Sequence, residues 1–234
     1  MDYAYIGKII IRLLPYTLIT IKIVIISFLA GCFFGGLLAW GKLCKVKVIN
    51  KIAFGYTTMI RCTPFIIMLF IVFYGIPYLL LPFGIDANVI GKEVFTIITL
   101  TMYTSSNLSD NFRASYVAIN KGQTEAALCV GMKKTQALRR IVFPQMIFIA
   151  LPMMSNVIVS EFQDTALAFA IGLVDLMGQA KVMDALSYNV NTFEIYVAVS
   201  LLFWGLAILC EQTIKYIHTS LDFSKKKRHS LKKA

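Results

Sequence analysis

Long apolar segments recur along the chain, separated by shorter stretches that carry most of the charge. An α-helix needs about 20 apolar residues to cross a hydrocarbon core of ~30 Å. By this criterion the pattern predicts five membrane-spanning helices, near residues 16–40, 55–80, 94–108, 145–165 and 193–217. The expected fold class is therefore all-α and integral to the membrane, with no soluble domain.

The composition supports this prediction. Hydrophobic residues make up 58% and charged residues 15% of the 234 residues, whereas an ordinary soluble domain has roughly 45–50% and 25%. Membrane topology and attraction to anionic lipid headgroups explain the net charge of +11. No nucleic-acid-binding motif accompanies that charge, so we expect membrane lipid and no nucleic acid among the partners.

The basic residues also predict the orientation of the chain. Five spans place the two termini on opposite sides, and the inner loops of membrane proteins carry an excess of lysine and arginine. Most of the 23 lysine and arginine residues fall in inner segments if the N-terminus is outside. We therefore expect an outer N-terminus and a cytosolic C-terminus with a basic tail at residues 218–234.

The chemistry that would define an enzyme is missing from the sequence. The five cysteines form no Cys-x-x-Cys pair, and only His218 and His229 could join them in a metal site. The sequence contains neither a GxxxxGK[ST] nucleotide-binding loop nor an HExxH helix. The prediction is a non-catalytic chain with no catalytic residues, no metal ligands and no cofactor of its own.

A polar stretch at residues 105–140 interrupts the apolar pattern and is too long for a simple helix connection of about 2–8 residues. Within it, Thr124 is expected to cap a short helix and Glu125 to lie in the first turn. Gly131 is expected to end that helix, because glycine adopts the left-handed conformation without steric cost.

A second short helix is expected from about Lys133 to Phe143, before Pro144 opens the next span. The product would be a bent pair of helices at the membrane surface. The pattern alone leaves two interpretations open: a docking site for another protein, or an amphipathic element that rests on lipid headgroups.

The same stretch resembles the signature loop of the membrane subunits of bacterial ABC importers, in which Glu-Ala-Ala is followed by Gly, Ile and Pro. The matching residues are Glu125, Ala126, Ala127, Gly131, Ile141 and Pro144. Three further stretches resemble the polar amino acid permease branch of that family: IRCTPFIIMLFIVFYGIP, SDNFRASYVAINKGQTEAA and LPMMSNVIVSEFQDTAL. The chain has Cys62, Asp110, Gln163 and Ala166 where glycine, glutamate, lysine and serine are usual.

The resemblance covers about residues 15–181 and implies the type I ABC importer fold. It implies one transmembrane permease domain over residues 1–234, with a coupling loop at about residues 109–144. The implied protein takes up amino acids across a bacterial cell membrane and pairs with a second permease subunit, identical or related. Two cytosolic ATPase subunits, which would bind ATP and Mg, and an extracytoplasmic solute-binding protein complete the implied assembly.

The family's coupling helices dock on the ATPase. The residues that match the docking positions are Glu125, Ala126, Ala127 and Gly131. Their chemistry fits docking, since small alanines allow a close approach, a glycine permits a bend and a carboxylate accepts hydrogen bonds.

The last part of the fourth span predicts the solute path. As one continuous helix, residues 145–174 would measure ~45 Å, so a break is expected, and we place it at residues 160–165. An acidic side chain at membrane depth costs ~2.5–3.5 kcal/mol and usually faces the bundle interior or a water-filled cavity. The predicted path or outer-gate residues are Asn156, Glu161, Gln163 and Asp164.

Two alternatives remain open for this region and for the class. Glu161 and Asp164 could simply face water at the outer interface. The chain could also be a secondary carrier or channel that works without an ATPase, although the odd span count and the elaborate polar loop argue against it. Glu211, in the last span, is expected to pair with Lys215 at i,i+4 spacing.

Overall fold

The computed structural model describes residues 3–84, 89–188 and 190–221. Helices make up almost all of this part, and it contains no strand. The predicted all-α class is confirmed. Most of the predicted basic tail, from residue 222 onwards, lies outside the described residues.

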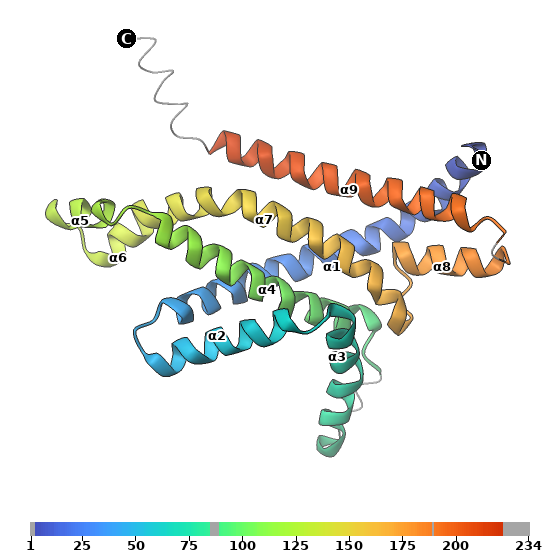
Figure 1. Ribbon diagram of the computed structural model, residues 1–234, viewed down its shortest axis with the longest axis horizontal. Coiled ribbons are helices and arrows are strands. Elements are labelled where there is room, and N and C mark those ends of the chain that lie inside the picture. The colour runs from blue at the N-terminus through green and yellow to red at the C-terminus, as the bar shows by residue number, and fades with distance from the viewer. Residues whose placement is uncertain (1–2, 85–88, 189, 222–234) are drawn as a thin grey trace, which may run out of the picture.

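Four long helices form a bundle in which each contacts its neighbours and the last returns to the first (Figure 1). The contacting pairs are α1 with α4, α4 with α7, α7 with α9, and α9 with α1. Their bounds are Tyr3–Leu43 for α1, Lys92–Ala118 for α4, Phe143–Thr165 for α7 and Thr192–Ser220 for α9.

The α1–α4 contact is close because α1 carries a Gly-x-x-x-Gly pair. A Cβ atom on Gly31 would lie 2.3 Å from Cγ2 of Thr104, and one on Gly35 would lie 3.0 Å from Cβ of Leu108. Small residues spaced by four allow the backbones of membrane helices to approach, which increases dispersion contact where no hydrophobic effect drives association. The α1–α4 seam therefore depends on the absence of side chains at these two glycines.

The second predicted span, residues 55–80, is wrong as a single helix. It forms α2 (Lys47–Cys62) and α3 (Phe65–Leu80), and α3 projects away from the bundle (Figure 1). Pro64 has no N–H and forces the preceding residue out of the helical region, and Thr63 is extended with φ −96° and ψ 129°. The hydroxyl of Tyr103 donates a hydrogen bond to the Thr63 carbonyl, which attaches this joint to α4.

Helix α4 is more polar than the other three long helices of the bundle. Four helical segments of the described chain are long and apolar enough to cross a membrane: Tyr5–Leu43, Phe65–Phe83, Lys134–Ile171 and Thr192–Ser220. Helix α4 does not reach this apolarity because its buried faces carry serine and threonine. Several of their hydroxyls donate to helix carbonyls, as in Thr99 to Phe95 (2.9 Å) and Ser109 to Ser106 (2.7 Å), so these polar atoms are satisfied within the bundle.

The break predicted at residues 160–165 is also wrong, because that stretch is α-helical. The chain changes to a 3-10 helix, η4, at Ala166–Ile171 and stops at Gly172, whose φ is 75°. Glycine takes this left-handed conformation without steric cost, so the helix ends at this position. Nζ of Lys92 donates to the Gly172 carbonyl (3.0 Å) and ties the turn to the start of α4.

Helix α8 (Leu176–Leu186) follows this turn. The Asp175 side chain caps it by accepting from the Gly178 N–H (3.0 Å), and the Thr20 hydroxyl donates to the same carboxylate (3.2 Å). Helix α8 is thereby attached to α1 at the end of the bundle opposite to the hairpin formed by α5 (Lys121–Cys129) and α6 (Lys134–Ala137) (Figure 1).

Candidate functional site

The first helix of the predicted loop is α5 (Lys121–Cys129), and its cap differs from the prediction. Asn120, not Thr124, occupies the N-cap and accepts a hydrogen bond from the Gly122 N–H (2.8 Å). Asparagine is among the best N-cap residues, and its cap starts the helix one turn earlier, so that Thr124 lies inside it.

Helix α5 ends at glycine as predicted. Gly131 has φ 83°, and its N–H donates to the Leu128 carbonyl (3.0 Å). The Met132 N–H then reaches back to the Ala127 carbonyl (3.1 Å). These two bonds form the Schellman motif, which satisfies the carbonyls left open at a helix end and reverses the chain direction.

The second predicted helix is not a separate element. Helix α6 (Lys134–Ala137) continues through a π-helical turn, η3 (Leu138–Val142), directly into α7. Pro144 lies just after this turn and has no N–H to donate, and the wider π turn accommodates that missing donor. The hairpin is therefore continuous with α7 along one helical path.

The hairpin α5–α6 turns part of the predicted docking set outward. Glu125, Ala126 and Gly131 are exposed, whereas Ala127 is buried, with 3% of its surface accessible. In the described residues, no ion-pair partner occupies the Glu125 carboxylate. Exposed apolar side chains accompany it, Val130 being 78% accessible. The outward face thus combines a free carboxylate, a small residue and apolar surface.

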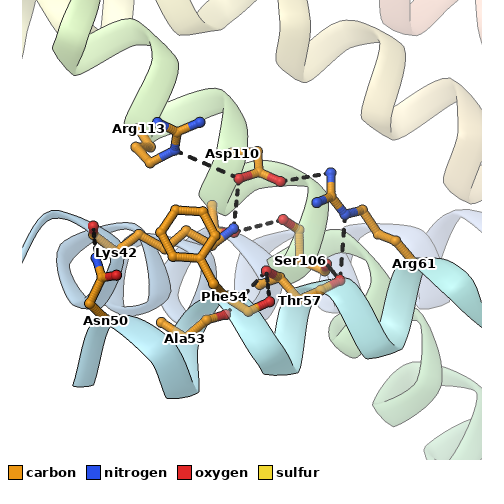
Figure 2. A network of polar contacts seen from close by, with 10 residues as sticks. Lys42, Asn50, Ala53, Phe54, Thr57, Arg61, Ser106, Asp110 and Arg113 are labelled. Atoms are coloured by element: carbon orange, nitrogen blue, oxygen red, sulfur yellow. Dashed lines mark hydrogen bonds and ion pairs between the residues drawn. The ribbon is translucent and has the colours of Figure 1, made fainter. Parts of the chain in front are cut away.

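A polar cluster that the sequence analysis missed lies where α1, α2 and α4 meet (Figure 2). Its centre is Asp110 on α4, whose Oδ1 lies 2.6 Å from Nζ of Lys42 on α1. Its Oδ2 lies 2.7 Å from Nη1 of Arg61 on α2. Nε of Arg113, one turn further along α4, lies 3.9 Å from Oδ1 of Asp110. Asp110 thereby joins three helices.

Neutral groups complete this Asp110 cluster. The Lys42 ammonium also donates to the Ser109 hydroxyl (2.8 Å), and the Ser106 hydroxyl donates to the Thr57 carbonyl (3.0 Å). The Phe54 ring lies 5.2 Å from Nζ of Lys42, within cation–π range. The sequence alone does not predict that these residues meet, because they lie on three different helices and come together only through tertiary packing.

The four residues predicted for the solute path separate into two environments. Glu161 is 2% accessible and accepts a hydrogen bond from the Thr104 hydroxyl, so it faces the interior of the bundle. Asp164 is half-buried, whereas Asn156 and Gln163 are exposed on the side of α7 that faces α9. The four residues therefore lie in two separate places, and their part in the solute path or outer gate stays a prediction.

A polar concavity of about 330 Å³ lies on the exposed side. Its lining residues come from α7 and α9: Ser155, Asn156, Val159, Ser160, Gln163 and Glu211. The predicted Glu211–Lys215 ion pair does not form between these two described residues. Glu211 instead lines the concavity, as an acidic residue inside an otherwise apolar span often does.

An all-helical bundle made for a bilayer, with an exposed hairpin at one end and a polar concavity between two apolar helices, defines a membrane-embedded transport subunit. Residues 31–222 match the family described as "Binding-protein-dependent transport system inner membrane component". That match covers most of the chain, and the chain belongs to this family.

Curated relatives support the same assignment. The L-cystine transport system permease protein TcyL of Bacillus subtilis is 34% identical over 90% of this chain and 87% of its own length. The probable amino-acid ABC transporter permease protein PatM of Vibrio harveyi is 30% identical over 89% of this chain and 91% of its own.

Solved structures support the fold. A crystal structure of an amino acid ABC transporter with histidines superposes with a TM-score of 0.80 at 24% identity, over 94% of this chain and 99% of that chain. An inward-facing MetNI methionine ABC transporter gives a TM-score of 0.69 at 19% identity, over 94% and 99% of the two chains. The predicted transmembrane fold of type I ABC importers is thereby confirmed.

Proposed function

We propose that this chain is the permease subunit of an ATP-driven importer that takes up amino acids delivered by an extracytoplasmic solute-binding protein. Family membership supports the importer class. The amino acid class is supported by relatives named for cystine and amino-acid transport, which are 34% and 30% identical along most of the chain.

The outward face of the hairpin α5–α6 is the observation that carries this proposal. Glu125 and Ala126 are exposed there beside apolar Val130, and the path continues through η3 into α7. A helix that only rested on headgroups would not need a glycine-terminated hairpin continuous with a span. A docked ATPase subunit could instead move α7 through it.

The proposed assembly assigns the energy source to other chains. Two cytosolic ATPase subunits would bind and hydrolyse ATP with Mg, and this chain would hydrolyse nothing and hold no cofactor. A second permease subunit, identical or related, would complete the solute path. The hairpin would lie in the cytosol of a bacterial cell with the N-terminus outside, as the distribution of lysine and arginine favours.

Reconstitution of the complex tests the function. The chain, the ATPase and the binding protein encoded beside it would be purified together and placed in liposomes with ATP inside. We expect uptake of radiolabelled amino acid that requires ATP, the binding protein and an ATPase with an intact nucleotide site. Equal uptake by the permease without the ATPase would instead establish a secondary carrier or channel.

A further inference from the structure

Glu211 is the one acidic residue of the described part of α9 beyond its first turn, and it lines the concavity opposite the polar face of α7. A pair of stacked aromatic rings gives a reference point for the position of Glu211 along the bundle. Phe148 on α7 and His218 on α9 have centroids 4.2 Å apart. Seven residues, or two helical turns, separate Phe148 from Ser155 and likewise His218 from Glu211. Glu211 thus lies ~10 Å further into the bundle than the stacked pair.

The exposure of Glu211 at this depth needs a polar neighbour. An acidic side chain that faces lipid near the membrane centre costs ~2.5–3.5 kcal/mol, and such residues normally face a bundle interior or a water-filled cavity. No side chain of the described chain forms an ion pair with Glu211. The Glu211 carboxylate is therefore available to bind a cationic or hydrogen-bond-donating group of a solute that enters the concavity.

The size and the polar groups of the concavity suit the ammonium and carboxylate groups of an amino acid. Its volume of about 330 Å³ lies within the range of ~300–1,000 Å³ typical of small-molecule sites. Glu211 contributes a carboxylate that accepts hydrogen bonds, and an ammonium group carries three N–H donors. Asn156 and Gln163 contribute amides, which can donate to the carboxylate end of a solute and accept from its amine.

We propose that Glu211 binds the ammonium group of the transported amino acid, while Asn156 and Gln163 orient the rest of the solute. This inference rests on the proposed amino acid importer and adds to it a specific anchor. Glu161 does not serve in this role, because it is buried and bonded to Thr104 within the bundle. The path wall is the Asn156–Gln163 side of α7, and it faces α9.

Labelling of an introduced cysteine tests the location independently of transport. In the assembled complex with Cys62 and Cys129 replaced by serine, Glu211→Cys would react with a water-soluble cationic methanethiosulfonate. Leu209→Cys is the matched control, since Leu209 lies two residues away on another face of α9 and is 63% accessible. We expect rapid labelling at 211 and little at 209. Equal labelling at both positions, or none at 211 because a second subunit covers it, would overturn the placement.

Uptake tests the chemistry. Radiolabelled L-cystine, L-arginine and L-glutamine would be offered to the reconstituted complex with Glu211→Gln, and we expect uptake to fall about tenfold or more because a charged hydrogen-bond partner is lost. Glu211→Asp should restore part of it. The control Glu194→Gln, an acidic residue in the first turn of the same helix, should retain uptake, and size-exclusion chromatography would verify assembly of each variant.

The outcomes separate the two proposals. Uptake of a probe by the unmodified complex with full retention in Glu211→Gln would refute the ammonium anchor and leave the importer function standing. Failure of the unmodified complex to take up any of the three probes with ATP would contradict the amino acid function and, with it, the anchor.

Discussion

Nζ of Lys42 lies 2.6 Å from Oδ1 of Asp110, and the Lys42 side chain is completely buried between α1 and α4. A buried ammonium is tolerated only when a counter-charge and hydrogen bonds replace its hydration. Asp110 and the Ser109 hydroxyl supply both. The pair joins α1 to α4, about three helical turns before α5 begins at Lys121.

Asp110→Asn should therefore destabilise the protein strongly. It leaves the Lys42 ammonium without its counter-charge, and breaking a buried pair costs ~3–5 kcal/mol, reduced here because Asp110 is 23% accessible. The thermal midpoint of the detergent-solubilised complex would measure the loss. Arg113→Gln is the control, since its Nε is 3.9 Å from Asp110 and it is 38% accessible, and a partly exposed pair of this kind is worth ~0–1 kcal/mol. Equal losses in both variants would contradict the buried-pair account.

Glu125→Lys should uncouple the permease from its ATPase. The exposed carboxylate is replaced by a cation on a surface that already carries Lys121 and Lys133, so hydrogen-bond donors on a partner are repelled. ATP hydrolysis stimulated by loaded binding protein would be measured in the reconstituted complex, together with retention of the binding protein on the liposomes. We expect lost stimulation with retained binding. Stimulation as in the unmodified complex would remove Glu125 from the docking surface.

Gly131→Val should shorten or unwind the end of α5. The left-handed conformation costs a residue with a Cβ roughly 1–2 kcal/mol, and it costs a β-branched residue more. A Cβ at Gly131 would meet nothing within 4 Å, so the cost comes from the backbone alone. Gly131→Asn should consequently retain most coupled ATP hydrolysis, because asparagine tolerates φ 83° better. Identical activity of the Val and Asn variants would contradict the conformational explanation.

Gly31→Leu should disrupt the seam between α1 and α4. The new side chain would collide with Thr104, whose Cγ2 lies 2.3 Å from the position of the added Cβ. Gly36→Leu provides a matched control on the same helix, since a Cβ there meets nothing within 4 Å. The yield of monodisperse complex and its thermal midpoint should fall for Gly31→Leu and change little for Gly36→Leu. A similar fall in both would point to loss of helix flexibility and not to the seam.

Local chemistry explains which features the sequence predicts well. The end of α5 is predictable because Gly131 alone decides the conformation of that position. The first, fourth and fifth spans are predictable because the bilayer fixes their length, whereas the second divides at Pro64. The prediction of Thr124 as the N-cap is wrong because Asn120, four residues earlier, is also a good N-cap residue. The sequence alone does not decide between the two positions.

Features that depend on several helices escape the sequence. Lys42, Arg61 and Asp110 meet through tertiary packing, and each alone resembles an ordinary interfacial charge. Glu161 and Gln163 are two residues apart, yet a helix turns one into the bundle and the other toward α9. The acidic character of a position in a span predicts that a polar neighbour exists, but it does not predict on which side of the helix that neighbour lies.

The joint at Thr63–Pro64 has a mechanical consequence. The Thr63 N–H donates to the Ile60 carbonyl (3.2 Å), and the Ile67 N–H donates to the Pro64 carbonyl (3.0 Å). These two backbone hydrogen bonds lie on opposite sides of the Thr63–Pro64 peptide bond. The Tyr103 hydroxyl holds the Thr63 carbonyl to α4, while Gly31 and Gly35 of α1 lie close against α4. Helix α3 is thus attached at its base to α4, and α4 packs closely on α1 and leads at its far end to the hairpin α5–α6, so one helix connects the joint with the hairpin.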